Sequence, residues 1–147
     1  MQLEPTGIAP NMALVHASPR DPVWEYLEYA QQAAANFVLF EQPACFVGHT
    51  HVPRTFEEAV DRSGHGTVRA RANMEQIDLF DGIRRIVNPG SVGQPRDGDP
   101  RAAYAVVDTE SGSFTTRRVA YNVVKAQELI LAAGLPSSLA SRLSLGM

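Results

Sequence analysis

Gly48-His49-Thr50-His51 directly follows the apolar run Ala44-Cys45-Phe46-Val47, and this junction predicts where a buried strand ends. The glycine allows the backbone to bend sharply as the strand gives way to a loop. On an extended backbone, two histidines at i and i+2 point to the same side, with Cα atoms roughly 6.6 Å apart. That spacing suits two imidazoles that converge on one metal or on two adjacent metals.

A second apolar run, Met12-Ala13-Leu14-Val15, also ends in a histidine, His16. Between the two runs, apolar residues at helical spacing predict a helix over 22–36, with Asp21 as its cap and Pro22 in its first turn. Strand, helix and strand form a βαβ unit, and the near-continuous apolar strands are typical of parallel strands covered on both faces. The histidines are therefore expected at one carboxyl-terminal sheet edge.

The second half of the chain is predicted to consist mainly of strands and turns. Asp81-Gly82 lies between two apolar runs, 76–80 and 83–87, which predicts a hairpin. Thr55–Gly66 fits either a helix with a capping box or an irregular strand. The other expected elements are a glycine- and proline-rich loop over 88–100, strands over 102–108 and 114–120 around a turn at 110–112, a helix over 123–133 and a short helix through Leu143.

Composition restricts the class of protein. A chain of 147 residues predicts a single domain, and a formal net charge of -3 without a dense cluster of Lys or Arg argues against nucleic acid as a partner. Cys45 is the single cysteine, and its apolar strand predicts a small buried hydrophobic residue in a reducing compartment. No stretch has the pattern of a signal peptide or a membrane span, so we expect a soluble cytoplasmic protein without a membrane partner.

Three motifs in a fixed order carry a family resemblance. Gly-His-Thr-His-Val-Pro at 48–53 follows a core strand, Val15-His16 ends an upstream strand, and Asn88-Pro89-Gly90-Ser91 comes after. Together they resemble the calcineurin-like metallophosphoesterases, in particular the small bacterial phosphodiesterase-like branch. The continuations Val92–Asp97 and Arg101–Tyr104 are also similar to that family. The resemblance extends from about Leu3 to the end of the chain.

The resemblance implies a set of metal ligands. His16 and His49 match the two histidines that bind one metal, and His51 matches the histidine that binds the other. The family hydrolyses phosphate esters with two metals that activate a bridging water for in-line attack on phosphorus. Manganese, iron, zinc or nickel all suit such mixed nitrogen and oxygen ligands. His65 matches no ligand motif and is expected to be an exposed loop residue.

The resemblance also places Asn88, Ser91 and Arg96 in a loop near the phosphate, where amide, hydroxyl and guanidinium groups are donors. A structural alternative remains open for each of the three. Asn88 and Ser91 also suit a role in holding the turn, and Arg96 also suits an ion pair with Asp97 or Asp99.

The chain departs from the family pattern in one respect. The family's N-terminal half carries Asp-x-His, Gly-Asp and Gly-Asn-His motifs, and no residues before His16 match them. We therefore expect residues 1–147 to be a single, partial domain, the C-terminal part of a metallophosphoesterase α/β/β/α sandwich with mixed sheets and flanking helices. The open sheet edge of such a fragment predicts self-association, or binding to a complementary N-terminal half.

Charge limits what the fragment can hold. Two divalent cations 4 Å apart repel by roughly 17 kcal/mol at an effective dielectric of 20, and neutral imidazoles supply no negative charge against this. The chain alone is thus expected to bind at most one metal, weakly, and to be inactive. The leading hypothesis is a metal-dependent hydrolase of phosphate mono- or diesters. The alternatives are a non-catalytic binding or subunit module, with at most one metal on His16, His49 and His51, and a plain α/β domain with core histidines.

Overall fold

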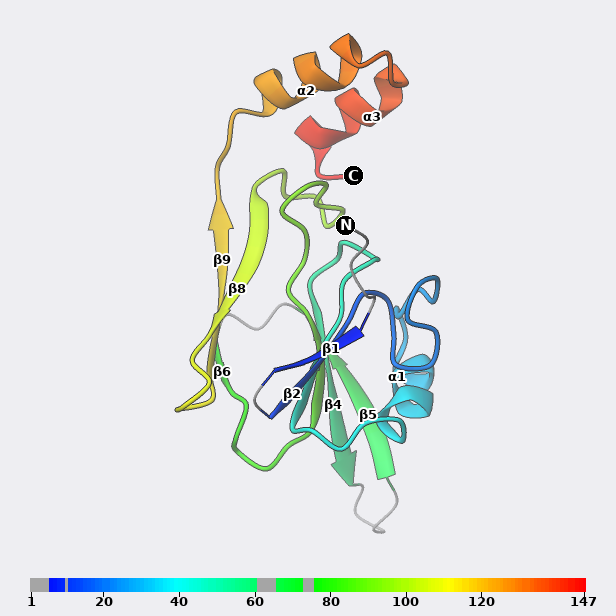
Figure 1. The fold of residues 1–147 in the computed structure, drawn as a ribbon, viewed down its shortest axis with the longest axis vertical. Helices are drawn as coiled ribbons and strands as arrows, with labels where there is room; N and C mark the ends of the chain where they lie inside the picture. Colours follow the sequence, from blue (N-terminus) through cyan, green and yellow to red (C-terminus); the bar gives the residue numbers. More distant parts are fainter. Residues whose placement is uncertain (1–5, 10, 61–65, 73–75) are drawn as a thin grey trace.

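A computed structural model describes residues 6–9, 11–60, 66–72 and 76–147, which form two β-sheets packed face to face (Figure 1). In spatial order, the larger sheet A contains β1 (Thr6–Ala9), β2 (Met12–Val15), β3 (Ala44–Phe46), β7 (Arg85–Asn88), β4 (Arg54–Val60) and β5 (Gly66–Arg71). Sheet B contains β6 (Gln76–Asp78), β9 (Ser113–Val119) and β8 (Ala102–Val107). The helical elements are α1 (Ala30–Phe37), α2 (Val123–Ala132), α3 (Ser137–Ser141) and the 3-10 turn η1 (Arg142–Leu145).

The centre of sheet A is parallel, as the two apolar runs predicted. β2 pairs with β3 and β3 with β7 in parallel, whereas β1, β4 and β5 join through antiparallel pairs, so the sheet is mixed. One core cluster lies between sheet A and α1, and it includes Phe37 and Cys45. A second lies between the sheets, where Phe46 stacks on Phe114 with ring centroids 5.8 Å apart. The predicted mixed α/β class is thus confirmed.

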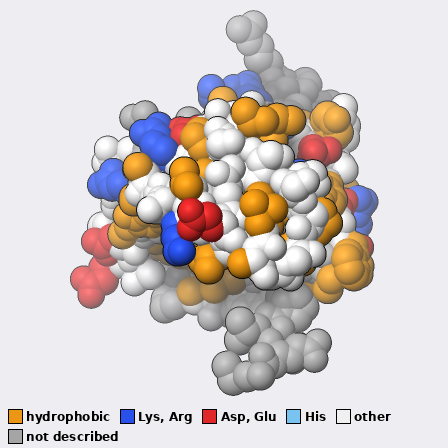
Figure 2. Space-filling view, turned by 90° about the horizontal axis from the view of Figure 1, so that it is seen from above, with side chains coloured by type: hydrophobic (Ala, Val, Ile, Leu, Met, Phe, Trp, Pro, Cys, Tyr) orange, Lys and Arg blue, Asp and Glu red, His pale blue; other side chains and the backbone are white. Residues whose placement is uncertain are grey.

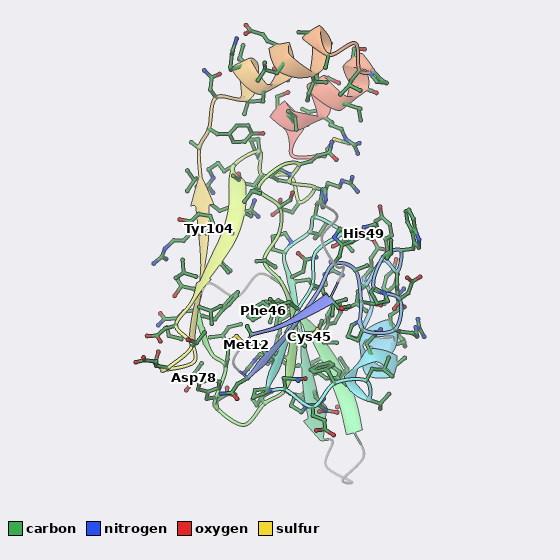
Figure 3. All side chains as sticks on the ribbon, viewed as in Figure 1. Met12, Cys45, Phe46, His49, Asp78 and Tyr104 are labelled. Carbon is green, nitrogen blue, oxygen red and sulfur yellow. The ribbon has the colours of Figure 1, made fainter. Side chains whose placement is uncertain are left out.

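Cys45 is fully buried on the α1 side of β3, among the residues labelled in Figure 3. Burial raises the pKa of its thiol to about 12, because a thiolate loses its hydration in an apolar environment. The prediction of a small buried hydrophobic residue is confirmed, and a thiol with this pKa is not a nucleophile at neutral pH.

The helix predicted over 22–36 is wrong in its first half. α1 begins at Ala30, and the segment before it is a turn followed by extended chain. Asp21 caps only a local turn, since its Oδ1 accepts the N–H groups of Val23 and Trp24. The helix starts later because the Gln32 side-chain oxygen accepts the N–H groups just before it, those of Glu28 and Tyr29.

The hairpin predicted at Asp81-Gly82 does not form. Both apolar runs contain strands, but β6 joins sheet B and β7 joins sheet A. All four residues of β7 are buried, and β3 and β4 occupy its two edges, so no edge remains for β6. The Asp81 carboxylate instead binds the guanidinium of Arg85 and redirects the chain from one sheet to the other.

Most other expected elements occur at their predicted places. β8 and β9 form an antiparallel hairpin, residues 89–101 lack strands and helices, and α2 and the short α3 close the chain. Thr55–Gly66 contains strand β4 rather than a helix, and His65 lies outside the described residues. Among the helices that the structure describes, none combines the length and the hydropathy needed to cross a lipid bilayer.

Candidate metal centre and phosphate loop

His16 and His49 meet where β2 and β3 end, at the carboxyl-terminal edge of sheet A. The Gly48 N–H donates to the His16 carbonyl oxygen at 2.9 Å, which extends the parallel pairing beyond the strands. The imidazoles lie edge to face with centroids 4.9 Å apart, and His16 Nε2 is 3.0 Å from His49 Nδ1. The convergence predicted from the two strand ends is therefore present for these two rings.

The backbone of the Gly-His-Thr-His loop differs from the extended form assumed above. His49 and His51 have φ angles of 59° and 62°, in the left-handed region, so strand alternation does not set their directions. The Thr50 N–H donates to the Gly48 carbonyl at 2.6 Å and closes a tight turn around His49. Such conformations cost about 1–3 kcal/mol for a residue with a side chain, and they concentrate at functional sites.

Asn88 holds this strained loop from the end of β7. Its Nδ2 donates to the Gly48 carbonyl at 2.7 Å and to Thr50 Oγ1 at 2.8 Å, and its Oδ1 accepts the Gly90 N–H at 2.9 Å. Asn88 and Thr50 are both buried. Since both amide hydrogens are used, the geometry favours the structural alternative for Asn88, in which it holds the turn.

His51 takes its orientation from the loop that follows β7. Its Nδ1 lies 2.9 Å from the Gln94 carbonyl oxygen, and this acceptor requires the proton on Nδ1. The other ring nitrogen, Nε2, then carries the free lone pair. A histidine that ligates a metal commonly has such a backbone partner on its second nitrogen.

The surroundings of His49 and His51 favour the neutral form of both imidazoles. Burial lowers the pKa of His49, and the neighbouring His16 lowers it further. Burial also lowers the pKa of His51, with a further contribution from the positive charge of Arg96. The neutral imidazole is the form that binds metals, so these shifts favour metal binding at neutral pH.

The His16–His49 pair fits part of a metal site. Two nitrogen ligands about 2.1 Å from a tetrahedral zinc lie roughly 3.4 Å apart, close to the 3.0 Å between His16 Nε2 and His49 Nδ1. In addition, His49 Nε2 is buried without a hydrogen-bond partner. Over the described ranges, however, no group of three or more His, Cys, Asp or Glu side chains converges closely enough to hold an ion. These residues thus provide a pair of ligands rather than a complete coordination shell.

The loop after Asn88 is shaped by Ser91 and Arg96. Ser91 Oγ accepts the N–H groups of Gly93 and Gln94 and so stabilises the turn. Arg96 does not form either of the ion pairs considered above, because its guanidinium donates to the Gln94 side-chain oxygen, at 2.8 Å from Nη2. Asp97 pairs with Arg118 and Asp99 with Arg101. Among the described residues, no carboxylate forms an ion pair with the positively charged guanidinium of Arg96.

Gly90 has a φ of +97°, and a Cβ added there would lie 2.7 Å from the Ala103 Cβ and 2.9 Å from the Pro53 Cγ. We expect Gly90→Ala to destabilise the fold by about 2 kcal/mol more than Gly98→Ala. Gly98 is the matched control because its φ is +84° but nothing lies within 4 Å of an added Cβ. Urea unfolding of both variants measures the difference, and equal losses would show that the close contacts do not matter.

Sequence reasoning missed Tyr26, whose ring lies 4.5 Å from that of His49 at an interplanar angle of 59°. Tyr26 falls in the segment whose spacing predicts a helix, and that spacing gives no sign of a site. The Gln94 carbonyl was also missed, since a backbone acceptor leaves no signal in a sequence. Figure 3 places His49 at the edge of sheet A near the segment that carries Tyr26.

Comparison with known proteins gives consistent matches. The family described as calcineurin-like phosphoesterase superfamily domain matches residues 9–112. The uncharacterized protein MJ0912 of Methanocaldococcus jannaschii is 36% identical over 134 residues, 89% of this chain and 50% of that protein. A crystal structure of a metallophosphoesterase from Sphaerobacter thermophilus matches with a TM-score of 0.83 and 42% identity, over 99% of this chain and 58% of the other.

A likeness in fold alone links the chain to the hypothetical protein PH1004 from Pyrococcus horikoshii, with a TM-score of 0.62 and 22% identity. That match covers 92% of this chain and 46% of the other. The chain thus spans about half the length of the relatives it matches.

Proposed function

Because this chain belongs to the calcineurin-like phosphoesterase superfamily, we propose that it carries the histidine part of a metal-dependent site that hydrolyses phosphate mono- or diesters. The observation that best supports this proposal is the His16–His49 pair, whose facing nitrogens lie 3.0 Å apart where two parallel strands end. A divalent metal bound there supplies Lewis-acid polarisation of a phosphoryl oxygen.

Each loop residue has a distinct part in this proposal. His16 and His49 hold one metal, and His51 offers Nε2 to a second, which makes the complete centre dinuclear. Asn88 acts through the loop by keeping His49 in its left-handed conformation. The unneutralised guanidinium of Arg96 attracts the phosphate, and the Ser91 hydroxyl shapes the loop that carries it. Manganese, iron, zinc and nickel all suit the donor set.

The proposal requires acidic ligands from outside the described residues, because imidazoles alone do not offset the charge of two divalent cations. A polypeptide with the remaining family motifs would supply them. The outer edge of β8 is available for such a partner, since β8 pairs only with β9 among the described strands. Exposed hydrophobic side chains also lie at several places on the end formed by α2 and α3 (Figure 2), and they are a second candidate surface for that partner or for a second copy.

A hydrolysis assay tests the function. We expect the chain with manganese to leave p-nitrophenyl phosphate and its bis ester unhydrolysed, and to hydrolyse them when mixed with a polypeptide matching the part of the Sphaerobacter thermophilus relative that this chain does not cover. His49→Ala in the mixture should abolish hydrolysis, whereas His65→Ala, outside any ligand motif, should not. Hydrolysis by the chain alone, lost in His49→Ala, would show that a carboxylate within these 147 residues completes the site.

Metal binding provides a separate test. Calorimetric titration with zinc should show at most one ion per chain, and His49→Ala should remove it because only one imidazole of the pair remains. One observation favours the alternative of a non-catalytic module. The described residues bring two histidine ligands together, and no group of three or more. Metal-dependent folding without hydrolysis in the completed mixture would favour that alternative. Two tightly bound metals per chain would contradict the charge argument.

A further inference from the structure

The segment between the first histidine strand and α1 exposes three aromatic side chains, and one of them, Tyr26, contacts His49. The exposed fractions are 74% for Trp24, 62% for Tyr29 and 45% for Tyr26. The Tyr26 ring contacts the His49 ring, and the backbone of Trp24 lies close to the same imidazole. The exposed Tyr26 ring therefore adjoins a proposed metal ligand, and Trp24 lies two residues before Tyr26 in the same segment.

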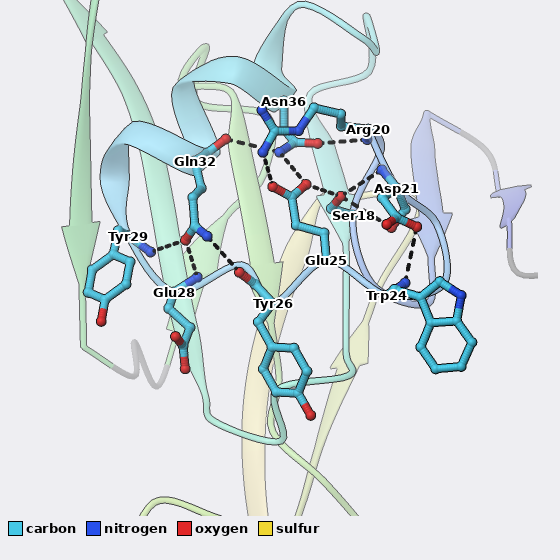
Figure 4. A network of polar contacts seen from close by, with 10 residues as sticks. All are labelled: Ser18, Arg20, Asp21, Trp24, Glu25, Tyr26, Glu28, Tyr29, Gln32 and Asn36. Carbon is cyan, nitrogen blue, oxygen red and sulfur yellow. Dashed lines mark hydrogen bonds and ion pairs between the residues drawn. The ribbon is translucent and has the colours of Figure 1, made fainter.

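Polar contacts hold this segment in its non-helical form (Figure 4). Asp21 Oδ1 accepts the Trp24 N–H at 3.1 Å, and Gln32 Nε2 donates to the Tyr26 carbonyl at 2.9 Å. The Arg54 guanidinium donates to the Glu28 carbonyl at 2.5 Å from the side of sheet A. The backbone of this segment is thus held by side chains of α1 and β4 and by Asp21 within the segment itself.

Glu25 anchors the segment from the opposite side. Its carboxylate binds Arg20 and Ser18 and accepts from the buried Asn36 amide at 3.2 Å. Figure 4 shows the rings of Trp24 and Tyr26 pointing away from this network, toward the same side.

Rigid, exposed aromatic rings are suited to binding another flat ring. Stacking of a base on an aromatic side chain contributes about 1–3 kcal/mol, and a fixed backbone lowers the entropy lost on binding. The Arg96 N–H donates to the His51 carbonyl oxygen at 3.2 Å, so Arg96 lies beside the histidine loop, and no described carboxylate pairs with its guanidinium. An exposed ring surface near a guanidinium that no described carboxylate pairs with matches a ligand with a flat ring and a phosphate.

We propose that Trp24 and Tyr26 form a stacking subsite for the aromatic ring of a phosphate ester, whose phosphate lies toward Arg96 and the histidines. This inference rests on the proposed function, which it narrows to esters that carry a flat ring. A nucleobase and a phenyl group share this chemistry, and separate ligands distinguish them.

Trp24 reports on its own subsite because it is the single tryptophan of the chain. The test titrates the full chain, with zinc, against adenosine 5′-monophosphate, phenyl phosphate and ribose 5-phosphate, and follows tryptophan fluorescence. We expect saturable quenching by the two aromatic esters and none by ribose 5-phosphate. Whichever of the two aromatic esters binds with the higher affinity identifies the kind of ring that the subsite prefers.

Two tyrosine variants show whether the nucleotide binds beside Tyr26. Tyr26→Leu should weaken adenosine 5′-monophosphate binding about tenfold, a loss within the range of one stacked ring. Tyr104→Leu removes a ring that is exposed to a similar degree, 39%, on β8, and should leave the affinity unchanged. Calorimetry on Trp24→Leu, which has no fluorescence signal, should show a comparable loss.

The outcomes separate this inference from the function on which it rests. Equal affinities for adenosine 5′-monophosphate and ribose 5-phosphate, equal effects of the two tyrosine variants, or no quenching by any ring would overturn the stacking subsite. Zinc-dependent binding of inorganic phosphate, lost in His49→Ala and kept in Trp24→Leu, would still support the metal-dependent phosphate site. Saturable quenching by adenosine without zinc-dependent phosphate binding would retain the ring subsite and contradict the proposed function.

Discussion

Asp81→Ala should lower the free energy of unfolding by about 3 kcal/mol, because it leaves a buried cation without its main partner. Arg85 is only 3% exposed, and its guanidinium forms a bidentate ion pair with Asp81, at 2.8 and 2.7 Å. Glu57, its second carboxylate partner, lies at 3.3 Å from Nε and is shared with Arg71. Glu57 therefore does not replace the lost pair.

Urea unfolding measures this loss, and Glu128→Ala is the control. The Lys125–Glu128 pair is exposed on both sides, so its removal should change the free energy of unfolding by less than about 0.5 kcal/mol. If both variants lost the same small amount, the carboxylate of Asp81 would not stabilise the crossing from sheet B to sheet A.

The effect of Asp81 should also depend on pH. Hydrogen bonds from Arg85 hold the pKa of Asp81 below its usual value of 3.8. The stabilisation is therefore complete above the unfolded-state pKa and is lost as the pH falls through the lower folded-state pKa. The difference in unfolding free energy between wild type and Asp81→Ala should accordingly shrink in acid. A difference that stayed constant down to the lowest measurable pH would contradict the ion-pair explanation.

Asn88→Ala should weaken zinc binding by 10- to 100-fold and destabilise the fold by about 2–3 kcal/mol, although Asn88 contacts no metal ligand side chain. The substitution leaves the Gly48 carbonyl and the Gly90 N–H without their side-chain partner. His49 then lacks the hydrogen bonds of Asn88 on either side of it, which keep its backbone at a φ of 59°. The loop should relax, and His49 Nδ1 should move away from His16 Nε2.

Asn122→Ala is the matched control for this prediction. Asn122 caps α2 by accepting the Lys125 N–H at 2.9 Å, far along the chain from the histidine loop. Removal of this cap should lower the free energy of unfolding by about 1 kcal/mol and leave the zinc affinity unchanged. Calorimetric zinc titrations of both variants, with unfolding curves, give the two readouts. Unchanged zinc affinity in Asn88→Ala would assign Asn88 a purely structural part in the turn.

Local pattern was sufficient for much of the fold. The two apolar runs that end in histidine are parallel neighbours, as their composition predicted, and their order brings His16 and His49 together at one edge. The β8–β9 hairpin and α2 lie where turn residues and periodicity placed them. In these segments propensity, pattern and tertiary contacts agree, and such agreement makes a segment predictable.

The errors lie where a hydrogen bond from a side chain competes with the local preference of the backbone. Gln32 accepts the N–H groups that would have extended the helix toward Pro22, and Asn88 holds His49 in a left-handed turn instead of a strand. The run after Gly82 became a central strand because it buries all four residues of β7 between two partners. A pattern along the chain contains none of these contacts.

By itself, the sequence determined the mixed α/β class, the parallel histidine-ended strands and the resemblance to the metallophosphoesterases, because these depend on burial period and on motifs of adjacent residues. Only the tertiary structure decided the left-handed loop around His49, the partner of Arg96 and the exposed aromatic segment before α1. The physical reason is that these features depend on which hydrogen-bond donors and acceptors meet in the folded chain, and a pattern of residue types does not specify those partners.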